Sequence, residues 1–442
     1  MKKILFYSST IAALGGFLFG FDTAVISGAE QSIQVLFSLN GFWHGFTVAI
    51  ALIGTVIGAL FVGKPADIFG RKTLLIVIAI LYAISGAGCA LSNSWITFLI
   101  ARFLGGLGIG ASSVVGPMYI SEISPSHLRG RLVMMFQLNI VIGILTSYLS
   151  NYLLANVGVD AWRWMLGVEF FPAAIFLALL FLIPQSPRWL VKVNRSSEAI
   201  EVLNKLGETD IENKIQEIKE SLETELDTQK QKLFSSRYKL PIIYSVLLAL
   251  FNQFSGINAL LYFAPRIFEM AGFANDSALL QSITLGLTNL IFTILAITVI
   301  DKYGRKTLLI IGSIGMFISM GLVSYTFYTK DFGNYLIMIY LISFIAFFAF
   351  SQGAVIWVFI AEIFPNKVRA KGQALGSSTH WIMATIISWL FPLVAESPSI
   401  GGGPSFLFFS LMMLLQLYFV LKYLPETKGK SLEEIERELT SK

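Results

Sequence analysis

The sequence predicts an all-α membrane protein with twelve transmembrane helices in two pseudo-symmetric six-helix halves. Three observations support this fold. Of the 442 residues, 55% are hydrophobic and only 13% are charged, a composition that suits lipid better than water. Apolar runs of roughly 20 residues, the length that crosses a bilayer, recur along the chain. Charged motifs that separate these runs in the first half return in the second half.

The apolar runs place the expected spans in order. Inside a bilayer the backbone has no water to bond, so each run is expected to form a helix. The first run is interpreted as a retained helix and not as a signal peptide, because it lacks a small-residue cleavage site and continues through Asp22. The expected spans are residues 5–27, 46–66, 73–92, 96–119, 131–154, 164–184, 241–265, 279–300, 307–328, 334–361, 371–394 and 404–424.

Two charged motifs occur twice. The pattern Asp-x-x-Gly-Arg-Lys at residues 67–72 returns at residues 301–306. A Glu followed seven residues later by Arg occurs at residues 122–129 and again at residues 362–369. A duplicated membrane bundle usually binds its ligand where its halves meet, so the repeat already points to a transporter.

Lysine and arginine gather at every second break between the spans, and the opposite breaks carry few of them. This asymmetry marks the cytoplasmic side, and an even number of spans then places both termini there. The net charge of +5 therefore comes mainly from the basic residues that orient the spans, and it gives no reason to expect a nucleic-acid partner. The basic residues of the cytoplasmic breaks are Lys2, Lys3, Lys64, Arg71, Lys72, Arg129, Arg131, Arg188, Lys192, Arg305, Lys306, Lys367, Arg369 and Lys371.

One long polar stretch separates the halves. It is rich in Glu, Lys, Asp and Gln, and between residues 211 and 222 it spaces Ile and Leu at helical intervals. This pattern predicts a cytoplasmic linker of short amphipathic helices. The expected organisation is an N-terminal half at 1–184, the linker at 185–239, a C-terminal half at 240–424 and a cytoplasmic tail at 425–442, whose stretch from Pro425 through Ile435 is expected to form another short helix.

The motifs together resemble the sugar porter family of the major facilitator superfamily along almost the whole chain. Within that family the sequence looks most like bacterial proton-coupled pentose and hexose symporters. The resemblance implies two six-helix halves that rock about a central monosaccharide site. It rests on the duplicated motifs, on Gly15 to Asp22 in helix 1, Pro187-Arg188-Trp189-Leu190 after helix 6, Asn252 to Asn258 in helix 7 and Pro425 to Gly429 after helix 12.

The duplicated acids and arginines are expected to form an inner gate, a charged network that holds the cytoplasmic ends together while the outer side is open. Exposed ion pairs contribute only about 0.2 to 1 kcal/mol each, which suits a latch that opens in every cycle. The alternative is that these charges only fix topology and helix ends. The gate residues are Asp67, Arg71, Glu122, Arg129, Arg188, Asp301, Arg305, Glu362 and Arg369.

Three ionisable residues lie too deep in the spans to be topology signals: Asp22, Arg102 and Glu169. Charges inside a bundle cost about 2.5 to 3.5 kcal/mol on insertion scales, so they are usually paired and functional. We expect Asp22 to face Arg102 and to carry the coupled proton, and the resemblance gives Glu169 a part in the same coupling. The alternatives are a static buried pair and a Glu169 that belongs to the gate.

A monosaccharide offers hydroxyls around a weakly apolar ring, so its site needs amides and aromatic rings with few charges. Such residues are sparse in these apolar helices, and for any one of them the alternative is an interhelical hydrogen bond. Gly256 among them permits a local break. The resemblance implies sugar contacts at Gln137, Gln253, Asn258, Asn289 and Trp357, and also at Phe19, Asn252, Tyr262, Gly353, His380 and Trp381.

The sequence departs from the family pattern at four positions. Asn252 replaces the more usual glutamine, and His380 stands where many relatives carry Gln or Asn. Ala354 takes the place of the helix 10 proline, which leaves open how a break forms there, since a proline usually frees that backbone. Gln185 replaces the acid of a Pro-Glu-Ser-Pro-Arg motif and removes one acid from the inner gate.

The predicted function is proton-coupled import of a pentose or hexose by alternating access. The main alternative is a facilitative uniporter, which would not need Asp22 against Arg102. An enzyme is not expected, because the metalloprotease, serine hydrolase and nucleotide-binding motifs are missing and His44 and His127 are isolated at loop-like positions. No cofactor or metal is expected. The expected partners are a monosaccharide, the proton and the lipid of a bacterial inner (cytoplasmic) membrane, with the protein as a monomer.

Overall fold

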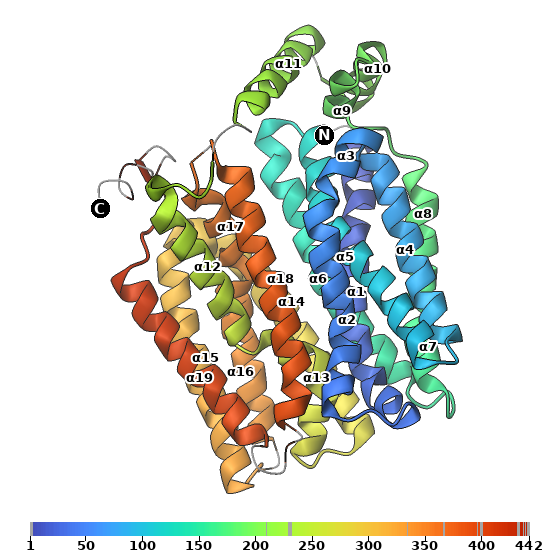
Figure 1. Ribbon diagram of the computed structural model, residues 1–442, viewed down its shortest axis with the longest axis vertical. Coiled ribbons are helices and arrows are strands. Elements are labelled where there is room, and N and C mark those ends of the chain that lie inside the picture. Colours follow the sequence, from blue (N-terminus) through green and yellow to red (C-terminus); the bar gives the residue numbers. More distant parts are fainter. Residues whose placement is uncertain are drawn as a thin grey trace. The chain divides into compact units, whose positions relative to one another are not determined.

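In the computed structural model every regular element of the described residues is helical (Figure 1). The described residues are 3–208, 210–228, 232–333, 335–365, 367–395, 397, 401–430, 434, 435, 437 and 439. Within them twelve helical segments are long and apolar enough to cross a membrane, which confirms the predicted fold class. These are Lys3–Leu36, Gly41–Phe61, Arg71–Leu91, Trp95–Ile123, His127–Leu154, Ala161–Leu180, Ser236–Met270, Asn275–Tyr303, Arg305–Thr329, Leu336–Ile363, Arg369–Ala395 and Gly402–Lys422.

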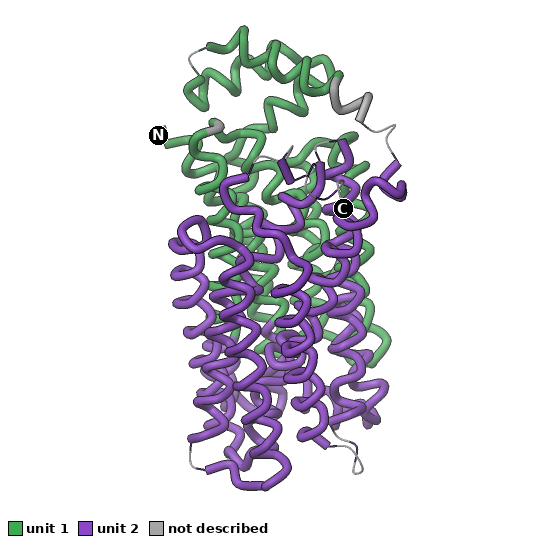
Figure 2. The backbone as a smooth tube through the Cα atoms, turned by 90° about the vertical axis from the view of Figure 1, so that its left-hand side faces the viewer, with its two compact units in different colours: residues 1–23, 53–147, 163–231 green, residues 24–52, 148–162, 232–442 purple. Residues whose placement is uncertain are grey.

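The chain folds as two compact units, drawn in two colours in Figure 2. Unit 1 contains residues 1–23, 53–147 and 163–231, and unit 2 contains residues 24–52, 148–162 and 232–442. The units therefore do not divide at the midpoint of the chain, and the predicted limits of the two halves stay a prediction. Four of the described helices contribute residues to both units: α1 (Lys3–Leu36), α2 (Gly41–Phe61), α6 (Ser126–Leu154) and the short α7 (Ala161–Gly167).

Unit 1 is built around α4 (Arg71–Leu91), which packs along α5 (Trp95–Ile123) and α8 (Phe170–Leu180). Apolar side chains such as Ile78 and Phe176 are fully buried between these helices. Burial of this kind leaves few places for polar groups, so the polar residues that do occur in unit 1 stand out. Two short helices complete this part of the chain, α3 (Gly63–Phe69) and α7 (Ala161–Gly167).

The polar linker forms three helices, α9 (Pro187–Lys192), α10 (Ser196–Leu206) and α11 (Ile211–Thr228). Helices α10 and α11 both pack against α9. Ile218 is buried, and Leu222 packs against the apolar core of unit 1. The regular spacing of apolar residues in the linker therefore does mark the buried face of an amphipathic helix, as predicted.

Unit 2 holds most of the remaining helices. Helix α15 packs along α19 and α16, and α12 packs along α18; α15 and α19 also lie side by side in Figure 1. The helices are α12 (Lys239–Phe254), α13 (Ile257–Met270), α14 (Asn275–Tyr303), α15 (Arg305–Thr329), α16 (Leu336–Phe350), α17 (Gln352–Ile363), α18 (Arg369–Ala395) and α19 (Gly402–Lys422). The tail helix predicted from Pro425 through Ile435 is not present at residues 425–430, which form a turn and irregular structure, and residues 431–433 lie outside the described residues.

Two of the spans in unit 2 are broken near their middle. The first break separates α12 from α13 at Gly256, whose φ of 87° is left-handed and suits glycine, which confirms the predicted break. The second separates α16 from α17 at Ser351, where φ is −119° and ψ is −88°. Ala354 lies in the first turn of α17, so the span that contains α16 and α17 is broken without a proline at that position.

Candidate functional site

A cluster of neutral amides surrounds the first break. Asn258 donates a hydrogen bond from its Nδ2 to the Oε1 of Gln253 at 2.7 Å. Gln253 in turn donates from its Nε2 to the Oδ1 of Asn252 at 3.0 Å, and the same nitrogen lies 3.2 Å from the ring nitrogens of His380. Asn252 and Gln253 are each only 1% exposed. The structure thus brings four of the predicted sugar-binding residues together in unit 2.

Aromatic rings lie next to these amides. The Trp357 and His380 ring centroids are 4.8 Å apart, and those of His380 and Trp381 are 4.9 Å apart. Tyr262 is buried one helical turn after Asn258 on α13. Hydrogen-bonding amides beside flat apolar rings are what a ring-shaped polyhydroxylated ligand requires.

The other predicted sugar-binding residues are more scattered. Asn289 on α14 is 8% exposed, and its Oδ1 accepts a hydrogen bond from Thr293 at 3.5 Å. Gly353 lies in the first turn of α17, beside the second break. Phe19 on α1 and Gln137 on α6 are half-buried in unit 1. Their approach to the amides of unit 2 stays a prediction.

A buried acid–base cluster lies in unit 1. Arg102 on α5 donates a hydrogen bond from its Nη1 to the Oδ1 of Asp22 on α1, and both side chains are at most 1% exposed. Gly105, one turn after Arg102, leaves space for the aspartate: a Cβ there would lie only 3.0 Å from Asp22 Oδ2. Glu169 is also 1% exposed and lies between α7 and α8.

Several polar atoms of this cluster have no hydrogen-bond partner among the described residues. They are the Oδ2 of Asp22, the Nε and Nη2 of Arg102 and the Oε1 of Glu169. Buried polar atoms are normally satisfied. The carboxylate oxygens are therefore available to a proton or to a further donor, and the Arg102 nitrogens, which stay protonated, are available to a further acceptor.

The first copy of the charged motif forms a network in unit 1. Arg71, at the start of α4, lies 3.1 Å from Asp67 near the end of α3 and 2.9 Å from Glu122 at the end of α5. Lys192 on α9 approaches the other oxygen of Asp67 at 2.9 Å. Glu122 also accepts a hydrogen bond from Ser186 at 2.5 Å.

The second copy forms the same network in unit 2. Arg305 donates from Nε and Nη2 to the two oxygens of Glu362 at 3.1 and 2.8 Å, and its Nη1 lies 3.0 Å from Asp301. Thr427 donates to Glu362 at 2.6 Å, in the way that Ser186 donates to the acid of unit 1. The repeat in the sequence is therefore a repeat in contacts.

The remaining predicted gate residues bond to other groups. Arg129 donates to the backbone carbonyl of Ser121 at 3.2 Å, and Arg188 donates to the hydroxyl of Ser221 at 3.0 Å. Arg369 donates to the carbonyl of Phe364 at 3.4 Å. These contacts tie helix ends within one unit and leave the role of the three arginines in a gate as a prediction.

A third duplicated element was missed in the sequence. The side chain of Gln185 accepts a hydrogen bond from the backbone N–H of Lys72 at 2.9 Å, at the start of α4. Glu426 does the same at the start of α15, where its two oxygens accept from the backbone N–H groups of Arg305 and Lys306 at 2.9 and 3.0 Å. The shared pattern Pro-x-Ser/Thr at residues 184–186 and 425–427 is the signal that would have found it.

A further charged cluster in unit 2 corrects the sequence interpretation of His44. This residue is not isolated in a loop: it is fully buried in α2, with its Nε2 2.6 Å from the Oε2 of Glu30. The other oxygen of Glu30 lies 2.9 Å from the Nε of Arg266 on α13, whose Nη2 donates to Gln34. Helix α1 continues to Leu36, well beyond the expected span, and that extension carries Glu30.

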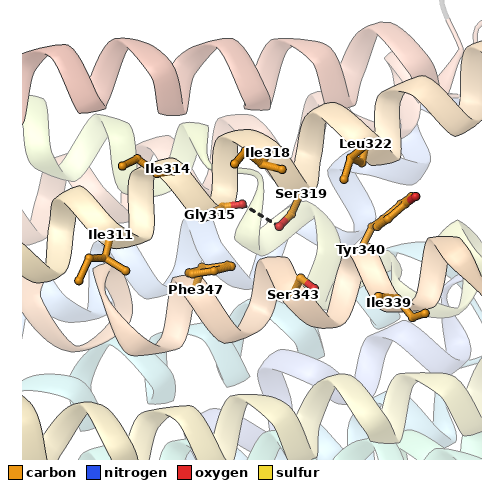
Figure 3. A pocket seen from close by; sticks show the side chains of 10 residues that line it. All are labelled: Ile311, Ile314, Gly315, Ile318, Ser319, Leu322, Ile339, Tyr340, Ser343 and Phe347. Carbon is orange, nitrogen blue, oxygen red and sulfur yellow. Dashed lines mark hydrogen bonds between the residues drawn. The ribbon is translucent and has the colours of Figure 1, made fainter.

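An open groove elsewhere in unit 2 has a different character. It measures about 420 Å³ between α15 and α16 and is lined mainly by apolar side chains such as Ile314 and Ile318, which are 42% and 50% exposed (Figure 3). Ser319 lies in this groove and donates to the carbonyl of Gly315 on its own helix at 2.7 Å. The groove is lined by none of the buried amides.

Comparison with known proteins agrees with the motifs. Residues 8–439 match the family model of sugar (and other) transporters. The chain is 39% identical to the D-xylose-proton symporter of Escherichia coli (strain K12), with 98% of this chain and 96% of that protein covered. It is 38% identical to the arabinose-proton symporter of Bacillus subtilis (strain 168), with 97% and 94% covered. A solved inward-open structure of the E. coli xylose transporter matches with a TM-score of 0.87 at 38% identity, covering 98% of this chain and 99% of that one.

Proposed function

Because the chain belongs to the sugar transporter family, we propose that it imports a monosaccharide together with a proton by alternating access. It is a membrane transporter and not an enzyme, and its relatives include symporters of D-xylose and arabinose. The observation that carries the proposal is the buried Asp22–Arg102 pair in unit 1. A transporter that only lets sugar equilibrate has no need for a buried carboxylate of this kind.

The amides of unit 2 bind the sugar. Gln253 and Asn258 present both donors and acceptors, and a hydroxyl group can do the same, so each sugar hydroxyl can replace one of the present amide contacts. Trp357 supplies a flat surface for the sugar ring. The substrate class is a pentose or hexose, since the site offers neutral hydrogen-bonding groups and no fixed charge beside them.

Asp22 carries the proton. In the charged state one of its oxygens is held by Arg102 and the other is free. A proton from the outer water that binds the carboxylate removes its negative charge and weakens the attraction of Arg102. Release of that proton on the inner side restores the pair. Glu169, buried in the same unit, is the second candidate for holding the proton.

The charged networks around Arg71 and Arg305 act as the inner gate. They lie at equivalent places in the repeat. Asp67 and Asp301 are 45% and 84% exposed in their pairs, so solvent screening keeps these two pairs weak. The basic breaks place both termini in the cytoplasm. The protein works as a monomer in the inner membrane of a bacterium, with lipid around its apolar helices.

The test is transport by purified protein in liposomes, with labelled D-xylose, L-arabinose, D-glucose, D-galactose and D-fructose, with and without an imposed pH gradient. The proposal predicts accumulation of at least one sugar above its outside concentration when the inside is alkaline. One pH unit supplies about 1.4 kcal/mol per proton, which limits accumulation to about tenfold for one proton per sugar. Entry that stops at equal concentrations under the gradient would make the protein a uniporter, and no entry of any sugar would overturn the proposal.

A further inference from the structure

The break between α16 and α17 is held by side chains. The hydroxyl of Ser351 donates to the carbonyl of Phe347 at 2.6 Å, which caps the end of α16. Its carbonyl accepts from the backbone N–H groups of Ala354 and Val355 at 3.2 and 2.8 Å, which starts α17. Gly312 on α15 makes room for this serine: a Cβ there would lie 1.8 Å from the Ser351 hydroxyl. The break is thus stabilised from both sides, without a proline.

A chain of amides leads from the sugar-binding residues to this break. Asn258 donates to Gln253, and Gln253 donates to Asn252. Asn252 then donates from its Nδ2 to the Oε1 of Gln352 at 3.1 Å. Gln352 is the first residue of α17 and is fully buried. The first contact beyond the proposed sugar site is therefore with the residue next to Ser351.

The chain continues past the break to two other helices. Gln352 donates from its Nε2 to the Oε1 of Gln416 on α19. Gln416 donates to the hydroxyl of Ser313 on α15 at 2.9 Å, and Ser313 donates to the carbonyl of Leu309 at 2.6 Å. Gln352, Gln416 and Ser313 are all fully buried. In this chain each side-chain NH₂ group donates to the side-chain oxygen of the next residue. A 180° flip of one amide would place NH₂ against NH₂ or oxygen against oxygen, so the orientations of the amides depend on one another.

We propose that Gln352, Gln416 and Ser313 are positioning residues that fix the Ser351 break in place of a proline and tie it to the occupancy of the sugar site. The second part rests on the proposed function. A sugar hydroxyl that takes over the Nε2 of Gln253 removes the donor to Asn252, and Asn252 holds Gln352. Helix α17 carries Trp357 at the sugar site and Glu362 at the Arg305 pair, so a change at Gln352 reaches both.

The first test needs no sugar. Hydrogen–deuterium exchange of the backbone amides at residues 351–355 is measured for the full-length parent and for Gln416→Leu and Ser313→Ala, and we expect at least tenfold faster exchange in both variants. Ser319→Ala is the matched control. Like Ser313, Ser319 is a buried serine of α15 whose hydroxyl donates one turn back, here to Gly315 at 2.7 Å. Unlike Ser319, Ser313 also accepts a hydrogen bond from Gln416. Ser319→Ala should exchange as the parent does.

A rescue separates positioning from general damage. Position 354 is where the family pattern has its proline, and a proline there gives up only the 3.2 Å bond from the Ala354 N–H to Ser351 and leaves the 2.8 Å bond from Val355 in place. Ala354→Pro added to Gln416→Leu should therefore slow exchange at the remaining amides of the break to within threefold of the parent. Parent-like exchange in both Gln416→Leu and Ser313→Ala would overturn the relay. Fast exchange that Ala354→Pro leaves unchanged would overturn the claim that the relay replaces a proline.

The second test adds D-xylose, L-arabinose or D-glucose. In the parent the sugar that binds should change exchange at residues 351–355 at least threefold, and in Gln416→Leu this response should be lost although the sugar still binds within threefold of its parent affinity. A retained response in Gln416→Leu would overturn the tie between site and break. If the parent binds none of the panel sugars, the proposed function fails, and the sugar-free result still decides whether the relay holds the break.

Discussion

Unit 1 and unit 2 carry the same charged motif at their helix ends but bury different chemistry further along. Unit 1 encloses a carboxylate and a guanidinium, Asp22 and Arg102, and it also buries the carboxyl group of Glu169. Around the break between α12 and α13, unit 2 buries neutral amides, with Gln253 at their centre. Unit 2 also buries a carboxylate, Glu30, but this one pairs with His44 and Arg266. The two units thus repeat the contacts at their helix ends and differ in the polar groups that they bury.

The difference matches the two cargoes. A proton needs a group that gains and loses charge, and this is costly to bury unless an opposite charge lies beside it. A sugar is neutral and needs partners that donate and accept without a charge to desolvate. On this account, changes in unit 1 alter coupling, and changes in the amides of unit 2 alter affinity. Mutations in each unit test this division, beginning with the variant that should change transport most.

Asp22→Asn should abolish accumulation driven by a pH gradient, because the amide keeps the shape of the side chain but cannot carry a proton. Sugar binding should persist. The measurement is uptake in liposomes with the inside alkaline, together with binding by calorimetry. Asp331→Asn, an exchange at an exposed aspartate outside the spans, is the control and should accumulate sugar normally. Accumulation by Asp22→Asn equal to that of the control would move the coupling role to Glu169.

Gln253→Ala and Asn258→Ala should each weaken sugar binding by about 1 to 3 kcal/mol, because each leaves a hydroxyl unpaired in a closed site. This corresponds to roughly 5- to 150-fold in Kd. Calorimetry on the purified variants measures the change, and Gln216→Ala on the exposed face of α11 is the control. Parent-like binding in both site variants would place the sugar elsewhere. Loss of proton coupling with unchanged affinity would reverse the division between the units.

Arg71→Ala and Arg305→Ala should shift the population toward the inward-open state, and by similar amounts, since the two arginines make equivalent contacts. Spin labels are attached to Gly130→Cys and Ala370→Cys, which directly follow Arg129 and Arg369 of the second repeated motif. Opening of the inner side is then measured as a longer distance between the two labels. The single native cysteine, Cys89, is buried and is not expected to take up label. An unchanged distance distribution in both variants would leave these charges with a role in topology only.

The smallest effect is expected from the helix caps. Gln185 and Glu426 occupy equivalent places, but only Glu426 adds a negative charge to the start of its helix, which typically contributes about 0.3 to 1 kcal/mol. Glu426→Gln should therefore lower thermal stability slightly and leave uptake intact. Gln185→Glu should raise thermal stability slightly. A large loss of transport in Glu426→Gln would mean that this acid takes part in the gate itself.

Features that depend on spacing and composition could be predicted from the sequence. Hydropathy alone locates the twelve spans, and the short spacing in the repeated motif brings Arg71 close to Asp67. The partner of Gln352 could not be predicted, because it lies 64 positions away on another helix, and a single amide in an apolar helix leaves hydropathy almost unchanged. Glu30 was not singled out, and His44 was wrongly interpreted as an isolated loop residue, for a similar reason. Their contact depends on how α1 continues and how α2 is rotated, which no local pattern encodes.

The central claim is that sugar and proton cross the membrane together, and the most direct test measures the movement of protons during sugar entry. Liposomes containing the parent protein, in weakly buffered medium with no imposed gradient, receive a sugar that the protein transports, and a pH electrode records the outside. The account predicts that the medium becomes more alkaline as sugar enters, and that Asp22→Asn gives no such change. Sugar entry by the parent with a constant outside pH would contradict it.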